Sequence, residues 1–221
     1  MPKITTVREE YCIYAPEWKQ TLQDAEQEAA WLAAWLAFDC IFGKRRNEIC
    51  RLKRRDVWTQ GKYLFARFMV GKKRSKTALL DRMPYTKKKV LTHYATTYIL
   101  SYLEEYDKQG FEGYLFPYDR LESNITVRTK FTNRLGQKEQ KEYTYKVEGG
   151  YRSPQDVHYW IKKVNPKIWA HLGRHTVATL AAEEGATEYD ICNILDVAPR
   201  TASRYVHHGT KLIERWSEQN E

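Results

Sequence analysis

The sequence predicts an α+β fold that is mainly α-helical and carries a small antiparallel β-sheet. Residues 24–42 are Ala-rich, strongly helix-forming and apolar on most sides, as expected for a central, largely buried helix. Two segments rich in aromatic and apolar residues, 63–70 and 78–85, flank a basic turn and predict a β-hairpin. The second half of the chain contains repeated helix-start and helix-stop signals, which predict further helices.

Shorter helices are expected on either side of this hairpin. Gly43 is predicted to end the first helix, because glycine readily adopts the left-handed conformation found at helix ends. A short helix should follow over residues 46–52. Residues 90–106 return to helical spacing, with apolar residues such as Ile99 and Leu103 on one face.

Capping residues mark the helices of the carboxyl-terminal half. Ser153 followed by Pro154 suits the N-cap and the first helical position. Thr187 is a second N-cap, and Pro199 begins the last helix, which holds Tyr205. The expected helices cover residues 154–164, 166–184, 188–195 and 199 onward.

The chain divides into one main domain with short appendages. Residues 1–22 show no period and are expected to form an amino-terminal arm, and residues 211–221 a short amphipathic tail. Residues 23–210 form the main domain. Within it, residues 121–150 contain two runs of alternating polarity around a turn, which predict an inserted, basic β-hairpin.

The composition favours a polyanionic partner. The chain has 221 residues, with 37 Lys+Arg against 28 Asp+Glu, a formal net charge of +9, 16 Tyr and 7 Trp. Lys and Arg gain from displacing the counterions of phosphate groups, so a basic, aromatic-rich domain suits a nucleic acid. On charge alone, a merely basic soluble protein remains an equal alternative.

Cysteine usage and hydropathy argue for the cytoplasm. The four cysteines lie far apart without CxxC spacing, which is typical of buried thiols in a reducing compartment. The longest apolar run, residues 29–42, is interrupted by Asp39 and is too short to cross a bilayer. We therefore expect a cytoplasmic protein that does not use a membrane.

The most informative stretch is HLGRHTVATLAAEEG, residues 171–185. His171 and Arg174 are three residues apart on the predicted helix, so both should project from one face. The apolar residues that follow anchor this helix. Farther along, TASRYVHHG places Tyr205 on a short helix with Arg204 beside it.

Together with GKRRNEICRLKRRDV upstream, this stretch resembles the tyrosine recombinase/integrase family. The resemblance covers roughly residues 24–210. The family's carboxyl-terminal box, H-x-x-R-H-T-x-A-T and a later tyrosine, is matched by His171, Arg174, His175, Thr176, Ala178, Thr179 and Tyr205. Its upstream box is matched by Gly43, Arg45, Glu48, Leu52 and Asp56.

The resemblance implies a role for each catalytic residue. Tyr205 would be the nucleophile, Arg45 and Arg174 would stabilise the phosphorane, and His171 would act as acid and base. Lys72, on the hairpin tip GKKRSK, is the first choice to protonate the leaving oxygen, with Lys73 and Lys76 as alternatives. Supporting roles fall to Glu48 and His175, and DNA contacts to Lys73, Arg74, Lys76 and Arg204.

These residue types suit the chemistry of phosphodiester cleavage. Negative charge develops on two non-bridging oxygens, and the planar forked donors of a guanidinium match that geometry. The phenol of tyrosine, with a pKa of about 10, is a workable nucleophile and a displaceable leaving group. The sequence offers neither a carboxylate cluster nor a Gly-rich phosphate loop, so we expect no metal and no cofactor.

The resemblance implies site-specific DNA recombination or integration through a covalent 3′-phosphotyrosine intermediate, as in mobile genetic elements. The expected partners are double-stranded DNA and further copies of the chain in a tetrameric synapse, with no small-molecule substrate. Two alternatives stay open: a type IB topoisomerase-like nicking and resealing enzyme, and a catalytically inactive DNA-binding regulator.

Three departures mark the chain as a divergent relative of the family. Where the family has Leu-Gly-His, this sequence has Leu195-Asp196-Val197, and the Val197 side chain cannot donate a hydrogen bond to phosphate. Arg200 is a candidate substitute. Gly173 stands where an apolar residue is usual. The third departure is the 121–150 hairpin, which the family's catalytic core seldom needs. In addition, the amino-terminal arm is too short for the family's DNA-clamping domain, which predicts a catalytic-domain fragment or a minimal form.

Overall fold

The computed structural model describes residues 15–70, 85–111, 113–118, 122–132, 138–148, 150–169 and 171–206, without side chains for 122–148 and 204–206. The helices are α1 (Ala15–Glu28), α2 (Ala30–Phe42), α3 (Arg46–Cys50), α4 (Tyr94–Lys108), α5 (Pro154–Val164), α6 (Leu172–Glu183), α7 (Glu188–Leu195) and α8 (Pro199–Val206), with a 3-10 turn η2 (Arg54–Asp56). The strands are β1 (Val57–Gln60), β2 (Tyr63–Met69), β3 (Tyr85–Leu91), β4 (Glu122–Thr132) and β5 (Lys138–Glu148). The predicted α+β class, mainly helical with a small antiparallel sheet, is confirmed.

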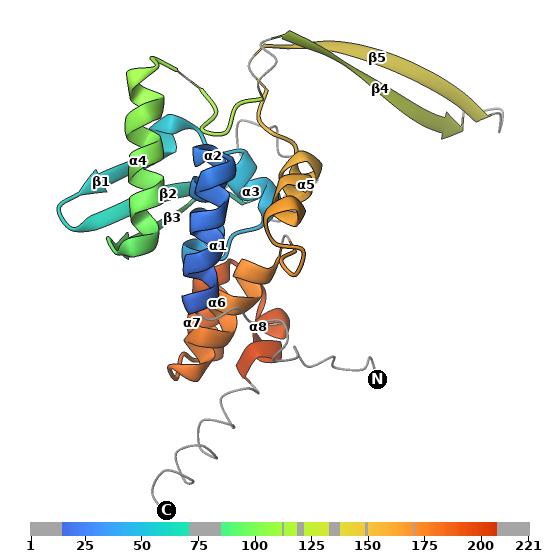
Figure 1. Cartoon of the computed structure of the whole chain (residues 1–221). Coiled ribbons are helices and arrows are strands. Elements are labelled where there is room, and N and C mark those ends of the chain that lie inside the picture. Colours follow the sequence, from blue (N-terminus) through green and yellow to red (C-terminus); the bar gives the residue numbers. More distant parts are fainter. Residues whose placement is uncertain are drawn as a thin grey trace, which may run out of the picture.

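Helix α2 lies at the centre of the fold, as its Ala-rich sequence predicts. It packs against α1, α4 and α6, and the three-stranded sheet passes behind α4 in the view of Figure 1. The Phe38 ring of α2 meets the ring of Phe68 from β2 at 6.4 Å and that of Phe116 at 6.0 Å, both edge to face. These aromatic contacts, with the buried Trp35, form the main core.

The first helix is shorter than the sequence predicts, and the arm is shorter too. One helix over residues 24–42 is expected, but Ala29 is extended (φ −168°, ψ 134°) and separates α1 from α2. Residues 15–22, expected to belong to an arm, form the first turns of α1, where Trp18 and Leu22 are buried. No glycine or proline near Ala29 predicts a helix break in the sequence. The break is seen only in the structure, where α1 packs against α2.

The sheet has the antiparallel order β1-β2-β3. The second strand is expected over 78–85, of which residues 78–84 lie outside the described part of the chain; β3 is observed from Tyr85 to Leu91. Lysines in YTKKKVL hide the alternation of β3, whose inward positions are Thr86, Lys88 and Val90. Consequently α4 begins at Tyr94, later than the predicted residue 90.

The carboxyl-terminal helices follow their caps, with one exception. The Ser153 Oγ accepts a 3.0 Å hydrogen bond from the Asp156 N–H and starts α5, and Thr187 starts α7. Helix α6 was expected from residue 166 but begins at Leu172. The Asn165 Oδ1 accepts a hydrogen bond from the Lys167 N–H at 3.0 Å, and this local turn replaces helix there.

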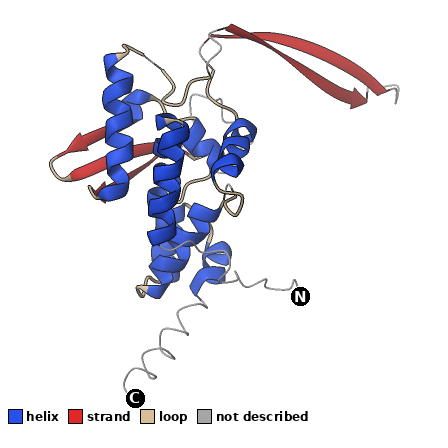
Figure 2. Ribbon diagram, viewed as in Figure 1, coloured by secondary structure: helices blue, strands red, loops and turns tan. Residues whose placement is uncertain are grey.

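A second, smaller core joins α6, α7 and α8. It consists of Ala178, Ala182, Ile191, Leu195 and Ala202. These helices form the lower part of the molecule in Figure 1. The β4–β5 hairpin pairs along its whole length and projects away from the helices (Figure 2).

Candidate active site

The turn between α2 and α3 brings the two sequence boxes into contact. Gly43 lies in the left-handed region (φ 55°), as expected for the end of α2. A Cβ at this position would lie 3.0 Å from the Val177 Cβ, 3.1 Å from the Leu195 Cδ2 and 3.3 Å from the Arg174 Cα. The glycine thus allows the upstream box to press directly on α6, which carries the other box.

Arg174 is buried at this contact, with 6% of its surface exposed. Its Nη1 donates to the Gly43 carbonyl at 3.0 Å, and its Nη2 donates to the Leu195 carbonyl at 2.5 Å. These two bonds fix the plane of the guanidinium between the end of α2 and the end of α7. A guanidinium held in this way is preorganised to face an anion.

Arg45 is held on the same turn by Glu48. The Arg45 backbone N–H donates to the Glu48 Oε2 at 3.0 Å, and the Arg45 Nη1 donates to the Oε1 at 2.7 Å. The adjacent Arg46 faces elsewhere, because its Nη1 donates to the Pro154 carbonyl of α5 at 2.9 Å. The two neighbouring arginines are therefore distinguished by their partners, and Glu48 orients the predicted one.

The two histidines of the box differ in environment. His171 is exposed and is the N-cap of α6, so it lies at the start of the helix, whereas the sequence predicts a helix that already begins at residue 166. His175 is half-buried, with its ring centroid 6.3 Å from that of Trp169. Burial lowers the pKa of His175, and the charges of His171 and Arg174 lower it further.

Helix α8, which carries Tyr205 and Arg204, packs against α6 and α7 through the buried Ala202. The side chains of Arg204 and Tyr205 lie outside the described part of the structure. So do Lys72, Lys73, Arg74 and Lys76, which belong to the segment between β2 and β3. The structure thus brings together the Arg45 turn, the Arg174 helix and the helix backbone of Tyr205.

Asp39 of α2 is a residue that sequence reasoning missed as part of the site. It is fully buried against α6, and among the described residues no standard hydrogen bond reaches either carboxyl oxygen. Burial raises the pKa of Asp39 to about 8, opposed by the nearby Gly173 N–H and by the charges of Arg174 and Arg46. The only sequence signal was an acid within an apolar helix.

The close approach of α2 and α6 explains Gly173. A Cβ there would lie 2.4 Å from the Asp39 Oδ2 and 2.8 Å from the Asp39 carbonyl oxygen. Because these distances leave no room for any side chain, glycine at position 173 and the acid at position 39 belong to one packing arrangement. The departure from the family pattern at Gly173 is therefore local and structural.

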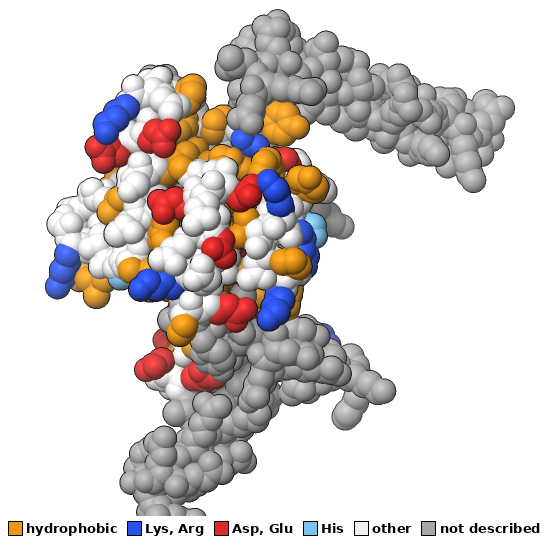
Figure 3. Space-filling model, viewed as in Figure 1, with side chains coloured by type: hydrophobic (Ala, Val, Ile, Leu, Met, Phe, Trp, Pro, Cys, Tyr) orange, Lys and Arg blue, Asp and Glu red, His pale blue; other side chains and the backbone are white. Residues whose placement is uncertain are grey.

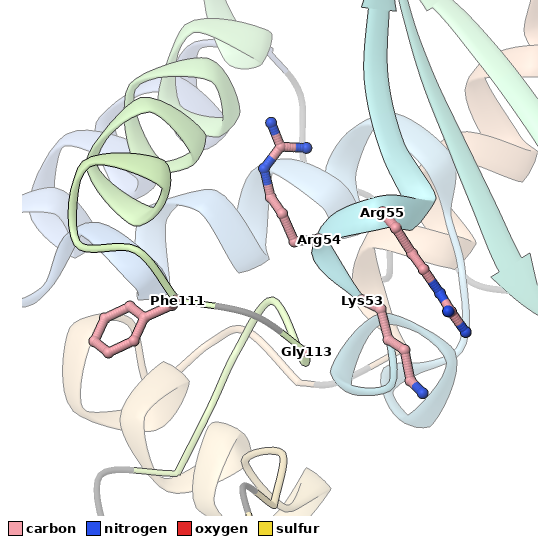
Figure 4. A pocket seen from close by; sticks show the side chains of 5 residues that line it. All are labelled: Lys53, Arg54, Arg55, Phe111 and Gly113. Carbon is pink, nitrogen blue, oxygen red and sulfur yellow. The ribbon is translucent and has the colours of Figure 1, made fainter.

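A pocket of about 410 Å³ lies elsewhere, beside η2, and is lined by Lys53, Arg54, Arg55, Phe111 and Gly113 (Figure 4). Lys53 and Arg55 point the same way from η2, and Arg54 points the other way. The Arg54 guanidinium is bound by Asp107 at 2.6 and 2.7 Å. None of the residues that line this pocket is one of the predicted catalytic residues.

Charges of both signs are mixed on the face of the protein shown in Figure 3. Acidic and basic side chains are interspersed over α1, α4 and α5 on the face shown in Figure 3, so the positive charge is not concentrated there. Within the described ranges, no three His, Cys, Asp or Glu side chains are grouped to hold a metal ion. None of the helices in those ranges is long and apolar enough to span a membrane.

The fold is similar to that of solved site-specific recombinases, so the predicted recombinase-like fold is confirmed. No protein-family model and no curated protein sequence matches the chain. Among solved structures, XerA recombinase matches with a TM-score of 0.62 and 17% identity, covering 100% of this chain and 66% of that one.

XerH site-specific recombinase also matches in two complexes. Its post-cleavage complex with a palindromic difH substrate has a TM-score of 0.62 and 15% identity, covering 99% of this chain and 54% of that one. Its pre-cleavage complex with difH has a TM-score of 0.58 and 15% identity, and the match covers 89% of this chain and 50% of XerH. The chain thus spans about half to two thirds of the length of these recombinases.

Proposed function

We propose that the protein is a site-specific DNA recombinase that cleaves and rejoins strands through a covalent 3′-phosphotyrosine. One observation carries the proposal: Arg174 is buried where the Arg45 turn meets α6, and the Tyr205 helix packs beside it. The three predicted residues thus belong to segments that each pack against α6 or form part of it, which supports a shared site.

In the proposed reaction, the Tyr205 phenol oxygen attacks phosphorus while its proton passes to His171. A phosphorus–oxygen bond to tyrosine forms, and the bond to the 5′ oxygen breaks. Lys72 donates a proton to that leaving oxygen. Arg45 and Arg174 stabilise the charge on the non-bridging oxygens, and the held geometry of both guanidiniums favours the transition state.

Double-stranded DNA is the proposed partner, since the XerH structures contain the difH substrate and this chain is basic. Lys73, Arg74, Lys76 and Arg204 are proposed to contact phosphates, and His175 to support the site. Residues 23–210 would form the catalytic domain, with 121–150 as an insertion, and a tetrameric synapse would join two sites. Reaction in the cytoplasm, without metal or nucleotide, is part of the same proposal.

The test is capture of the covalent intermediate. The protein is incubated with a pool of nicked duplexes of randomised sequence, whose short cleaved fragment diffuses away and traps the adduct. We expect a denaturant-resistant adduct, with peptide mapping to Tyr205 and none formed by Tyr205→Phe. The matched control is Tyr189→Phe, since Tyr189 is 74% exposed on α7. Equal adduct with Tyr205→Phe contradicts the assignment.

One observation favours a second candidate, the inactive DNA-binding regulator. Val197, which replaces the family's phosphate-contacting histidine, packs against the small core of α6, α7 and α8. A wild-type protein that retards the duplex pool in a gel but forms no adduct would be such a regulator. A topoisomerase-like enzyme would instead relax supercoiled plasmid without joining two sites.

A further inference from the structure

The end of α7 is capped by three cations from three different elements. The last carbonyls of a helix have no partner within the helix and carry its negative dipole end. Here each accepts a hydrogen bond from one charged side chain: Asn193 from Lys88, Ile194 from Lys44 at 3.1 Å, and Leu195 from Arg174 at 2.5 Å.

Asp196, the next residue, holds two of these cations. Its Oδ2 accepts a hydrogen bond from the Lys44 Nζ, and its Oδ1 lies 3.3 Å from the Lys88 Nζ and 3.2 Å from the Thr86 Oγ1. Lys44 has no exposed surface. Burial lowers the pKa of Lys44 to about 8, and the hydrogen bond and charge of Asp196 oppose this lowering.

Asp196 has a left-handed backbone conformation, which is uncommon for residues other than glycine. Asp196 has φ 52° and ψ 53°, and it is the only non-glycine residue with positive φ in the described part of the chain. Glycine is the residue favoured at such a helix end. The ionic contacts of the carboxylate offset the backbone strain that glycine would avoid.

We propose that Asp196 is a positioning residue for strand cleavage. By joining Lys44 of the Arg45 turn to Lys88 and Thr86 of β3, it fixes the end of α7. Only Val197 and Ala198 separate that end from α8, so a shift of α7 moves the helix that carries Tyr205. The same shift moves the Leu195 carbonyl that holds Arg174. This inference rests on the proposed function.

A purely structural role predicts a different outcome from a positioning role. Buried ion pairs often add little net stability, whereas loss of one partner leaves an uncompensated charge. A structural Asp196 should therefore affect cleavage only as far as it affects folding. A positioning Asp196 should affect the cleavage rate separately, because a misplacement of about 1 Å can cost about 100-fold in rate.

The first test compares Asp196→Asn with wild type on a nicked duplex enriched from the randomised pool. Asn keeps the shape and tolerates positive φ, but it removes the charge. We expect adduct formation to slow by about 10- to 100-fold, while the Kd for the duplex changes by less than about 3-fold. The control is Asp190→Asn at the other, exposed end of α7, where the carboxylate accepts from Thr187. That control should keep the wild-type rate.

The second test separates positioning from stability. Lys44→Met combined with Asp196→Gly removes the buried Lys44 charge together with its partner carboxylate and relieves the backbone strain, so its Tm should exceed that of Asp196→Gly alone. The cleavage rate should stay low, because the link to β3 is still missing. Recovery of rate together with Tm overturns the proposal. If Asp196→Asn does not fold, Lys88→Met tests the same link from β3, and a wild-type rate in that folded variant also overturns it.

Failure of this inference and failure of the proposed function give different results. If wild type forms no adduct, or Tyr205→Phe forms as much, the recombinase proposal and the role of Asp196 fall together. If wild type forms a Tyr205-dependent adduct and Asp196→Asn forms it at the same rate, only the role of Asp196 is overturned.

Discussion

The main core around α2 and the small core of α6, α7 and α8 are held together differently. The main core packs large rings, with Phe38 in contact with Phe42, Phe68 and Phe116. The small core contains three alanines and two larger aliphatic residues. Around the small core, buried polar side chains connect the helices: Arg174 and Lys44 both donate hydrogen bonds to backbone carbonyls of other segments.

The two kinds of packing suit two different tasks: folding stability in the main core and orientation of reactive groups around the small core. Apolar packing is non-directional, so the main core can provide most of the folding energy without specifying the orientation of a reactive group. Hydrogen bonds from fixed cations are directional, and they lie where the proposed chemistry needs accurate placement. Asp39 lies where the two cores meet, because it belongs to α2 of the main core and contacts Gly173 of α6.

The largest expected effect is in the main core. Phe38→Ala removes a fully buried ring with aromatic neighbours and should lower the free energy of unfolding by about 3–5 kcal/mol. Urea denaturation followed by circular dichroism measures this. Tyr159→Ala, at a position that is 67% exposed on α5, is the control and should change stability little. A loss below that of the control would show that Phe38 does not anchor the core.

A change in the small core should act on reactivity more than on folding. Arg174→Lys retains charge but cannot bridge the Gly43 and Leu195 carbonyls with one planar fork. We expect adduct formation to fall by about 100- to 1,000-fold, with a smaller loss of stability than for Phe38→Ala. Arg54→Lys, at the partly exposed pair with Asp107, should keep its rate. Near-normal cleavage by Arg174→Lys would contradict the proposed role of the guanidinium.

Gly173→Ala tests the contact between the two regions. In an unconstrained helix, this change is stabilising by about 1 kcal/mol. Here the added Cβ would lie 2.4 Å from the Asp39 Oδ2, so overpacking should instead destabilise the protein by about 1–3 kcal/mol. Thermal unfolding shows whether the Tm of Gly173→Ala is lower or higher than that of wild type. Asp39→Ala in the same chain should restore part of the loss, and a stabilised Gly173→Ala would show that the helices are farther apart.

A further expected effect is a pH dependence due to Asp39. Burial raises the pKa of Asp39 from 3.8 to about 8, so between these values the folded protein keeps a proton that the unfolded chain releases. The stabilisation from the neutral acid is therefore complete below pH 3.8 and is lost as the pH rises towards 8. The slope is at most about 1.4 kcal/mol per pH unit.

Urea denaturation at pH 5 and pH 8 measures this effect. Wild type should lose on the order of 3 kcal/mol more between these values than Asp39→Asn, which has no proton to release. Asp190→Asn should behave like wild type, because Asp190 is exposed and hydrogen bonds to Thr187 lower its pKa. Equal losses for wild type and Asp39→Asn would mean that Asp39 is charged in the folded protein.

The sequence by itself determined the fold class, the starts of α3, α5, α7 and α8, and the residue types of the candidate site. Ser153 and Thr187 act within their own turns, and the Ala-rich helix is apolar along its length, so both features can be recognised locally. The spacing of His171, Arg174 and Tyr205 carried the resemblance to the recombinases. Side-chain chemistry and helical period are properties of short segments, and short segments are visible in a sequence.

Only the tertiary structure decided how these parts are held. The break at Ala29 depends on α1 packing against α2, and the place of β3 depends on its pairing with β2. Lys44 and Asp196 are 152 residues apart in the chain, so neither position alone predicts the other. The close contact of Asp39 with Gly173 is equally invisible from the sequence. Burial, ion pairing and steric contact depend on the distances between segments, and these distances are fixed only in the folded chain.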